Sequence, residues 1–278
     1  MIILFMFLGL LALVLINVPI AVALAVVASA AMVFAHGPDV LPNVALVMMD
    51  GATNFPLIAI PLFVLAGAIM NSTGISRRLI AFASAIFGFV KGGLAMVNIG
   101  ASLFFAEISG SAVADVAALG SILIPAMKKK GYPAPFAAAV TSSSATLAVI
   151  IPPSIPMILY AVMAQSSVVQ LFVAGIVPGV LGGFLMMVVA HRFAVHYNYP
   201  VEEVFKVSQV VATFKGAALA FTLPVIILGG IFGGFVTATE GAGLAVVAAM
   251  VIGAIYRELN WPHLKQAMID GSVQTAVV

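Results

Sequence analysis

The sequence predicts an all-α polytopic membrane protein whose helices include a re-entrant hairpin and a broken transmembrane helix. The chain has 278 residues, of which 64% are hydrophobic and 7% are charged, whereas soluble domains carry roughly 25% charged residues. Its mean hydropathy of +1.26 also excludes a soluble globular protein. Two polar interruptions, one between Lys91 and Lys130 and one around Pro152 and Pro153, fall inside otherwise apolar stretches. These interruptions predict non-helical backbone at membrane depth.

The charges and the lack of cysteine exclude several functions. The eleven Lys and Arg residues give a formal net charge of +2. They cluster in the predicted loops, so they indicate membrane orientation rather than nucleic-acid binding. The chain has no cysteine, which rules out a disulfide, a thiolate metal site and a cysteine nucleophile. The first apolar stretch is too long for a cleaved secretory signal and is interpreted as a retained membrane helix.

Residues 1–90 are predicted to form scaffold transmembrane helices. Residues 2–35 are apolar and contain Pro19, which favours either one kinked, tilted helix or two short helices. Residues 36–54 form a polar loop without Lys or Arg, as expected outside the cytoplasm, and residues 55–70 cross the membrane. Residues 75–90 carry two arginines and are either an amphipathic connector on the cytoplasmic surface or a short crossing. The charges favour the surface position and a cytoplasmic N-terminus.

Residues 91–130 are predicted to form the re-entrant hairpin. Its apolar arms, residues 92–106 and 116–127, are shorter than the roughly 20 residues that a helical crossing needs. Cations lie at both ends of the segment, so both ends are expected on the cytoplasmic side. The polar residues 107–115 separate the arms. Their centre, Ser109-Gly110-Ser111, is expected inside the membrane, where irregular backbone must be buried in protein or line a wet cavity.

Residues 131–165 are predicted to form the broken helix. A helix of small residues is expected first, through residues 136–140, and the polar residues 141–144 follow it. Pro152 and Pro153, followed closely by a third proline, lack backbone donors and restrict the residues before them. A continuous helix is therefore excluded, and the helix is expected to break and to resume at Ser154.

The rest of the chain is predicted to continue with crossings and a second repeat. Residues 166–215 contain a crossing at 168–190 and a polar cytoplasmic connector at 191–215. Residues 216–278 begin the second repeat, with crossings at 216–235 and 241–256. The sequence Leu-Ala-Val-Val-Ala occurs at 24–28 and again at 244–248, and inverted repeats are the usual architecture of secondary transporters. On this interpretation the chain is a fragment that holds one repeat and the start of another.

The hairpin tip and the proline break together favour a binding site. The tip offers hydroxyls, free carbonyls and two helix ends, and the break adds carbonyls and a helix start. Neutral oxygens of this kind suit monovalent cations such as sodium, and helix N-termini favour anionic groups. For residues 142–144 alone, close helix packing is favoured over ligand binding. The two breaks together need compensation at membrane depth, which favours a site.

Two carboxylates flank the tip. Glu107 falls at mid-depth, where an unpaired carboxylate costs about 3 kcal/mol, so it is either functional or reaches water in a cavity. Asp115 follows Ser111 by four residues and is a candidate ligand or proton carrier. The preferred role of Asp115 is structural, as a carboxylate that stabilises the N-terminus of the second arm through the helix dipole.

These motifs resemble the large membrane subunit of TRAP (tripartite ATP-independent periplasmic) transporters, the DctM-like family. The resemblance rests on Phe104-Phe-Ala-Glu-Ile-Ser-Gly-Ser-Ala-Val-Ala-Asp115, Ile124-Pro125, Gly131-Tyr132 and Ile150-Ile-Pro-Pro-Ser-Ile155 with Tyr160, and on Ile60-Pro-Leu-Phe63, Ala66-Gly67, Pro178-Gly179 and Thr239-Glu240. It covers nearly the whole chain in the right order. The Ser-Gly-Ser hairpin and the Pro-Pro-Ser break are specific as a pair.

The resemblance implies an elevator-type transporter in the bacterial inner membrane that imports organic acids with sodium as coupling ion and no other cofactor. Its implied partners are a small, DctQ-like membrane subunit and a periplasmic, DctP-like substrate-binding protein. The implied transport domain contains residues 91–165. Ion and substrate contacts carry over onto Ser109, Gly110, Ser111, Ser144, Ile151, Pro152, Pro153 and Ser154, with Ser109 and Ser111 for sodium.

Two departures from the family and two alternative functions remain. Relatives often have glycine where this chain has Leu147-Ala148, and they are longer, with a second hairpin that closes the site. A stand-alone sodium- or proton-coupled carboxylate carrier or antiporter would need no binding protein. An intramembrane enzyme would need a nucleophile–base pair or metal ligands, and the sequence has no His-Glu-x-x-His or Gly-x-Ser-x-Gly pattern.

Overall fold

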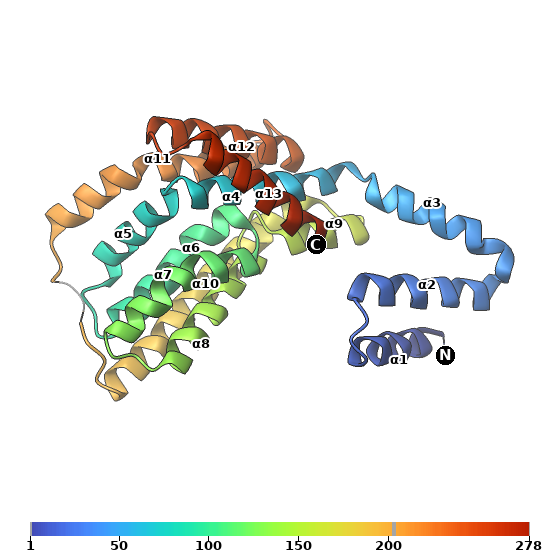
Figure 1. Cartoon of the computed structure of the whole chain (residues 1–278), viewed down its shortest axis with the longest axis horizontal. Helices are drawn as coiled ribbons and strands as arrows, with labels where there is room; N and C mark the ends of the chain where they lie inside the picture. The colour runs from blue at the N-terminus through green and yellow to red at the C-terminus, as the bar shows by residue number, and fades with distance from the viewer. Residues whose placement is uncertain (1, 202–203, 278) are drawn as a thin grey trace. The chain divides into compact units, whose positions relative to one another are not determined.

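The computed structural model describes residues 2–201 and 204–277, and the side chains of residues 108, 109 and 277 lie outside this description. Every regular element in the described ranges is a helix (Figure 1), which confirms the all-α prediction. The chain divides into two compact units, Met1–Asn54 and Phe55–Val278.

The first unit contains a helical pair, where the sequence left one kinked helix or two helices open. The helices are α1 (Ile2–Leu15) and α2 (Ile20–His36), and the two pack against each other. Between them Asn17 adopts a left-handed conformation, with φ of 67°, which asparagine tolerates better than most residues. Pro19 follows as the residue before α2. The chain therefore ends one helix and begins another.

The polar loop predicted at residues 36–54 is wrong, because this segment is mostly helical. It forms the short 3₁₀ helix η1 (Pro38–Val40) and then α3 (Leu41–Ala52). Apolar residues at 41, 44, 45 and 48 follow the helical period, and Pro42 lies in the first turn of α3, where proline is favoured. The absence of Lys and Arg favours a loop outside the cytoplasm, but the helical spacing of the apolar residues decides the structure of this segment.

The second unit holds the remaining helices. They are η2 (Phe55–Ile58), α4 (Ala59–Ser72), α5 (Ile75–Phe87), α6 (Gly93–Ser109), α7 (Ala112–Lys129), α8 (Ala134–Ala145), η3 (Thr146–Val149), α9 (Ile155–Met163), α10 (Val168–His196), α11 (Val207–Phe232), α12 (Ala238–Ile255) and α13 (Trp261–Val277). Helix α4 packs on α12 and α13, and α11 packs on α12 and α5. Helix α6 packs on α5, α7, α8 and α10, so α5 joins two groups of helices (Figure 1).

An aromatic cluster holds α5, α6 and α11 together. The Phe82 ring on α5 lies 5.9 Å from Phe104 on α6 and 5.1 Å from Phe221 on α11, measured between ring centroids. The Phe104 and Phe221 rings are also in edge-on contact at 5.3 Å. Such pairs contribute about 0.5–1.5 kcal/mol each beyond the apolar area that they bury. The first arm of the hairpin therefore packs against α5 and α11 through aromatic contacts.

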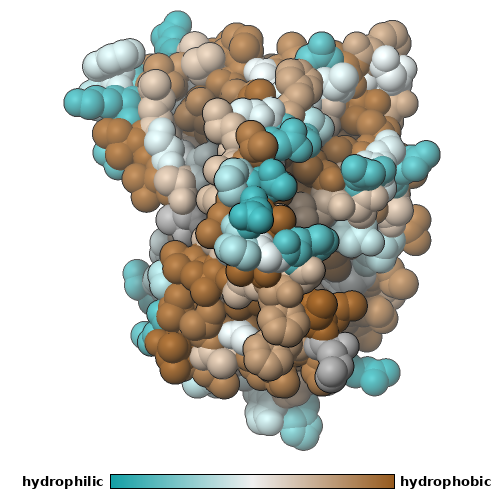
Figure 2. Space-filling model, turned by 90° about the vertical axis from the view of Figure 1, so that its right-hand side faces the viewer, coloured by the Kyte–Doolittle hydropathy of each residue, from teal (hydrophilic) through white to brown (hydrophobic). Residues whose placement is uncertain are grey.

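Within the described part of the chain, four helical segments are long and apolar enough to cross a membrane: Phe55–Ser72, Val168–His196, Val207–Phe232 and Ala238–Ile255. They match the four crossings predicted after residue 54. Large apolar side chains on these segments are exposed, as Val177 and Phe184 of α10 illustrate at 73% and 60% exposure. Hydrophobic side chains also cover much of the face seen in Figure 2. The surface thus suits lipid rather than water.

The cytoplasmic connector predicted at residues 191–215 is too long. Helix α10 continues to His196 and α11 already begins at Val207, so only residues 197–206 join them. The helix continues past its charged residues because Ala194 is fully buried against Gly92. The helix after the predicted crossing at 216–235 also begins earlier than residue 241, because Thr237 and Glu240 form a capping box at the start of α12.

An ion-pair cluster connects α5 to the loop after α12. Arg77 and Arg78 contact the Glu258 carboxylate at 3.1 and 2.7 Å, and the Arg78 guanidinium lies 3.9 Å from the centroid of the Tyr256 ring. The hydrogen bond from Arg78 lowers the pKa of Glu258 from its ordinary value of 4.5; partial burial opposes this, and the charges of both arginines add to the lowering.

The Glu258 cluster should make stability depend on pH in the acid range. The pKa of Glu258 is lower in the folded state than in the unfolded state. The ion pair therefore stabilises the fold fully at a pH above the unfolded pKa, and this stabilisation is lost as the pH falls through the folded pKa. An exposed pair of this kind contributes up to about 1 kcal/mol. We expect Glu258→Gln to melt below the parent protein at pH 7 and to approach it at pH 3. Thermal unfolding in detergent at both pH values checks this; a constant difference would contradict it.

Candidate functional site

The hairpin turns within two residues. Helix α6 ends at Ser109, and Gly110 follows with φ of 59° and ψ of 9°, the left-handed geometry in which glycine commonly ends a helix. Ser111 then begins α7 as its N-cap, because its Oγ accepts a hydrogen bond from the Ala114 N–H at 3.4 Å. The predicted interruption at 107–115 is therefore too long, since these two caps let one helix end and the next begin without a loop.

The predicted break after α8 is confirmed. Helix α8 passes into η3, and residues 150–154 are not helical. The backbone resumes as α9 with Ser154 as N-cap, at the residue where the sequence predicted it. The Ser154 hydroxyl accepts from the Met157 N–H at 3.4 Å and donates to the Val149 carbonyl at 2.7 Å. Ser154 is fully buried, so these two bonds satisfy it within the break.

The hairpin turn and the break contact each other directly. The Ile155 N–H donates to the Gly110 carbonyl at 3.3 Å. A Cβ atom on Gly110 would lie only 2.7 Å from the Pro153 carbonyl oxygen, so no side chain separates the two backbones. The structure thus brings Gly110 and Pro153 together, as predicted. It also places the beginnings of α7 and α9 beside the end of α6.

This arrangement can serve ions of both signs. The N-termini of α7 and α9 present partial positive charge, and the C-terminus of α6 presents partial negative charge. Helix N-termini are common anion sites. The hydroxyl oxygens of Ser111 and Ser154 each accept one backbone hydrogen bond, and a hydroxyl oxygen has two lone pairs. The Ser154 oxygen therefore keeps a second lone pair with which it can contact a cation.

The other predicted residues divide between the break and its surroundings. Ile151, Pro152 and Pro153 are buried in the break, and the Ile151 side chain packs against Gly179 of α10. Ser144 is buried in α8 and hydrogen-bonds to Ser102, away from the turn. The predicted sodium contact of the Ser109 side chain lies outside the described part of the structure.

The two carboxylates lie at opposite ends of helices. Asp115 is 1% exposed in the first turn of α7, where the helix dipole stabilises a negative charge. This position is the one that the preferred structural role requires, while a ligand or proton-carrier role stays a prediction. Glu107 is half-buried in the last turn of α6, where the dipole disfavours negative charge. Its position therefore gives Glu107 no structural benefit from the dipole.

Two hydrogen-bonded pairs between α6 and α8 were not predicted. The Asn98 Nδ2 atom donates to Thr141 Oγ1 at 2.6 Å, and the Ser102 hydroxyl donates to Ser144 Oγ at 2.8 Å. The signal was present in the sequence: residues 98 and 102 are one helical turn apart in an apolar arm and so share a face. Which helix that face meets could not be read from the spacing.

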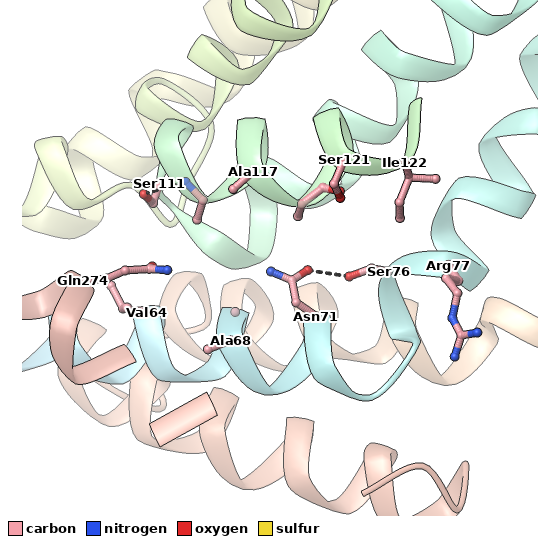
Figure 3. A pocket seen from close by; sticks show the side chains of 13 residues that line it. Val64, Ala68, Asn71, Ser76, Arg77, Ser111, Ala117, Ser121, Ile122 and Gln274 are labelled. Carbon is pink, nitrogen blue, oxygen red and sulfur yellow. Dashed lines mark hydrogen bonds between the residues drawn. The ribbon is translucent and has the colours of Figure 1, made fainter. Parts of the chain in front are cut away.

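A groove starts at the hairpin turn and runs along α7 (Figure 3). It has a volume of about 400 Å³. Its walls come from α4, α5, α7 and α13, through Val64, Gly67, Ala68, Asn71, Ser76, Arg77, Ser111, Ala114, Ala117, Ala118, Ser121, Ile122 and Gln274. Ser111 and Gln274 lie at one end and Arg77 at the other, while the Ser76 hydroxyl donates to Asn71 Oδ1 between them. Small and polar side chains thus line a route to the turn.

We expect the groove to be filled with water. The chain has no cysteine, so single cysteines can be introduced without background. Ala117→Cys, which faces the groove, should react with a membrane-impermeant thiol reagent in inverted vesicles at least about tenfold faster than Val116→Cys. Val116 is the neighbouring exposed residue and does not line the groove. Equal rates at the two positions would contradict a wet groove.

Comparisons with known proteins agree on one family. The model of the family described as tripartite ATP-independent periplasmic transporter, DctM component, matches residues 7–278. The C4-dicarboxylate TRAP transporter large permease protein DctM of Pseudomonas aeruginosa is 39% identical over 252 residues, which cover 90% of this chain and 59% of that protein.

Two further relatives carry other substrates in their names. The 2,3-diketo-L-gulonate TRAP transporter large permease protein YiaN of Escherichia coli is 39% identical over 273 residues, or 98% of this chain and 64% of that protein. The sialic acid TRAP transporter permease protein SiaT of Haemophilus influenzae is 39% identical over 226 residues, or 81% of this chain and 37% of that protein. The chain therefore spans less than two thirds of the length of each of these relatives.

Proposed function

This chain belongs to the DctM family of tripartite ATP-independent periplasmic transporters, and we propose from this membership that it forms part of the membrane permease of a sodium-coupled importer of organic acids. The observation that carries the proposal is the contact of the Gly110 turn with the break at Pro153 and Ile155. It assembles helix ends of both signs at one place, as binding a cation beside an anionic substrate requires.

The coupling ion is proposed to bind between the turn and the break. Hydroxyl oxygens of Ser109, Ser111 and Ser154 and nearby main-chain carbonyls are the proposed contacts, because sodium is a hard ion that takes oxygen ligands. Each sodium ion that enters down the membrane potential supplies about 2.3 kcal/mol per 100 mV. That energy can drive uptake without ATP hydrolysis.

The substrate is proposed to be an organic acid that reaches the turn through the groove. The relatives' names give C4-dicarboxylate, sialic acid and 2,3-diketo-L-gulonate, and each of these compounds carries a carboxylate. The beginnings of α7 and α9 favour such a group. Arg77 lies at the far end of the groove, where its positive charge attracts anions.

The protein is proposed to work in the bacterial inner membrane with two partners, a small DctQ-like membrane subunit and a periplasmic DctP-like binding protein that delivers the substrate. Residues 91–165, with the hairpin and the broken helix, are proposed to move together in an elevator-type transport step. Because the hairpin turn contacts the break directly, the hairpin and the broken helix can move as one body more easily than as two.

Uptake into proteoliposomes tests the proposal. The complete permease is reconstituted with its small subunit, and a binding protein loaded with radiolabelled substrate is added outside, with and without an inward sodium gradient. We expect uptake only when both the binding protein and the gradient are present. Uptake with sodium alone would instead indicate a stand-alone carrier, and uptake that ignores sodium would overturn the ion site at the turn.

A further inference from the structure

Four polar side chains join α6 to α8 inside the second unit. Asn98 and Ser102 on α6 pair with Thr141 and Ser144 on α8, at 2.6 and 2.8 Å. None of the four is more than 1% exposed. Here the four residues are called the α6–α8 ladder. Its position inside the protein means that neither lipid nor water can replace a bond that is lost.

The hydrogen bonds of the ladder are oriented. The Thr141 hydroxyl donates to the Ala137 carbonyl at 2.9 Å, and the Ser144 hydroxyl donates to the Thr141 carbonyl at 3.2 Å. Each of these hydroxyls has therefore used its proton within α8 and presents a lone pair to α6. Donors on α6, the Asn98 amide and the Ser102 hydroxyl, meet these lone pairs. Both bonds form together in one axial register of the two helices, and a shift by one turn, about 5.4 Å, leaves at most one donor opposite an acceptor.

The same two helices lead to the site. Ser102 precedes Gly110 by eight residues, or about 12 Å of helix, and α8 leads through η3 into the break. The axial register of α6 against α8 consequently decides whether Gly110 meets Pro153 and Ile155. The hydrogen bond between the turn and the break is long, at 3.3 Å, and holds the register less firmly than the ladder does.

We propose that Ser102, Ser144, Asn98 and Thr141 are positioning residues for the sodium site: they fix the register of the hairpin against the broken helix without touching the ion. This inference rests on the proposed function, because it assumes that sodium binds between the turn and the break. It assigns Ser144 a role different from the ion contact that the sequence predicts.

The chemistry of Asn98 indicates that the ladder fixes the axial register of α6 against α8 and does not simply hold the two helices together. The Asn98 Oδ1 atom is buried without a hydrogen-bond partner among the described residues. An unsatisfied buried acceptor costs about 1–3 kcal/mol, which an apolar residue of similar size would avoid. Adhesion alone would thus be served better by leucine, whereas only a directional donor distinguishes one register from another.

Sodium binding by the purified complete permease tests the inference. Equilibrium binding of ²²Na⁺ is measured for the parent protein, Ser102→Ala, Ser144→Ala and the double variant. We expect each single variant to raise the Kd for sodium at least fivefold. The double variant should be no more than twofold weaker than the weaker single variant, because both substitutions remove the same bond. Ser142→Ala is the matched control, since its exposed hydroxyl bonds only within α8, and it should stay within twofold of the parent.

A second measurement separates positioning from general destabilisation. The melting temperature without sodium is recorded for each variant, together with Thr141→Val, which removes a ladder hydroxyl but keeps the side-chain shape. A raised Kd in variants that melt within a few degrees of the parent supports the inference. Parent-like affinity in Ser102→Ala and Thr141→Val, or a loss of binding that only follows a loss of folded protein, overturns it. Absence of sodium binding by the parent overturns the proposed function itself.

Discussion

Replacing Gly110 with alanine should remove sodium-dependent uptake almost completely. Gly110 has a φ of 59°, and an added Cβ would lie 2.7 Å from the Pro153 carbonyl oxygen. The left-handed conformation costs about 1–2 kcal/mol for a residue with a Cβ, and overpacking costs about 1–3 kcal/mol more. Each 1.4 kcal/mol corresponds to tenfold in affinity. The two costs together, about 2–5 kcal/mol, predict that sodium affinity falls by roughly thirtyfold to several thousandfold, as measured by ²²Na⁺ binding and by initial uptake rates.

Two other glycines separate the causes of this effect. Gly131 also has a positive φ, 88°, but an added Cβ would meet nothing within 4 Å. Gly131→Ala therefore introduces strain without a clash. Gly216 lies in α11 with open space and no positive φ, so Gly216→Ala introduces neither. Sodium affinity should be close to the parent value in both. If Gly110→Ala bound sodium as tightly as Gly131→Ala, the close contact between the turn and the break would not be required for sodium binding.

Replacing Gly175 with alanine should displace the break from the other side. Gly175 lies in α10, and an added Cβ would clash with the Ile150 carbonyl oxygen and lie 2.6 Å from Met157 Cε. Because a main-chain carbonyl cannot rotate away like a side chain, α10 and the break must separate. We expect a loss of about 1–3 kcal/mol in stability. Melting temperature and sodium Kd, measured on the same sample, should both deteriorate.

Gly182 provides the matched control on the same helix. An added Cβ there would lie 3.4 Å from Leu147 Cδ2, the end of a flexible side chain. Gly182→Ala should therefore leave melting temperature and sodium affinity near the parent values, and it removes a glycine from a helix interior, which favours stability by up to about 1 kcal/mol. An equal loss in Gly175→Ala and Gly182→Ala would show that the break is not in tight contact with α10.

Local chemistry explains which parts of the fold could be predicted from the sequence. Pro152 and Pro153 cannot continue a helix, and Ser154 is a favoured N-cap, so the break and the restart of α9 followed from these residues alone. Gly110 and Ser111 likewise predict a turn. Polar residues extend from 107 to 115, so polarity predicts a longer turn than the structure has. The caps Gly110 and Ser111 mark its actual ends.

The parts that escaped prediction depend on contacts between distant segments. The resemblance implies an ion or substrate contact at Ser144, and nothing in the sequence indicates that its hydroxyl pairs with Ser102, 42 residues away. The groove needs α4 and α13 to face α7, and the sequence carries no periodic signal for such a pairing. Helix α3 was not predicted for a different reason. The segment lacks Lys and Arg, which favours a loop, whereas the helical period of the apolar residues between 41 and 48 predicts the helix.

The hydrogen bond from the Ile155 N–H to the Gly110 carbonyl uses main-chain atoms only. Substitution of a side chain cannot delete such a bond, except by proline at 155 or by a residue too large for position 110. The side chains around this contact can therefore change while the turn and the break stay joined, so the contact itself constrains the sequence chiefly at positions 110 and 155.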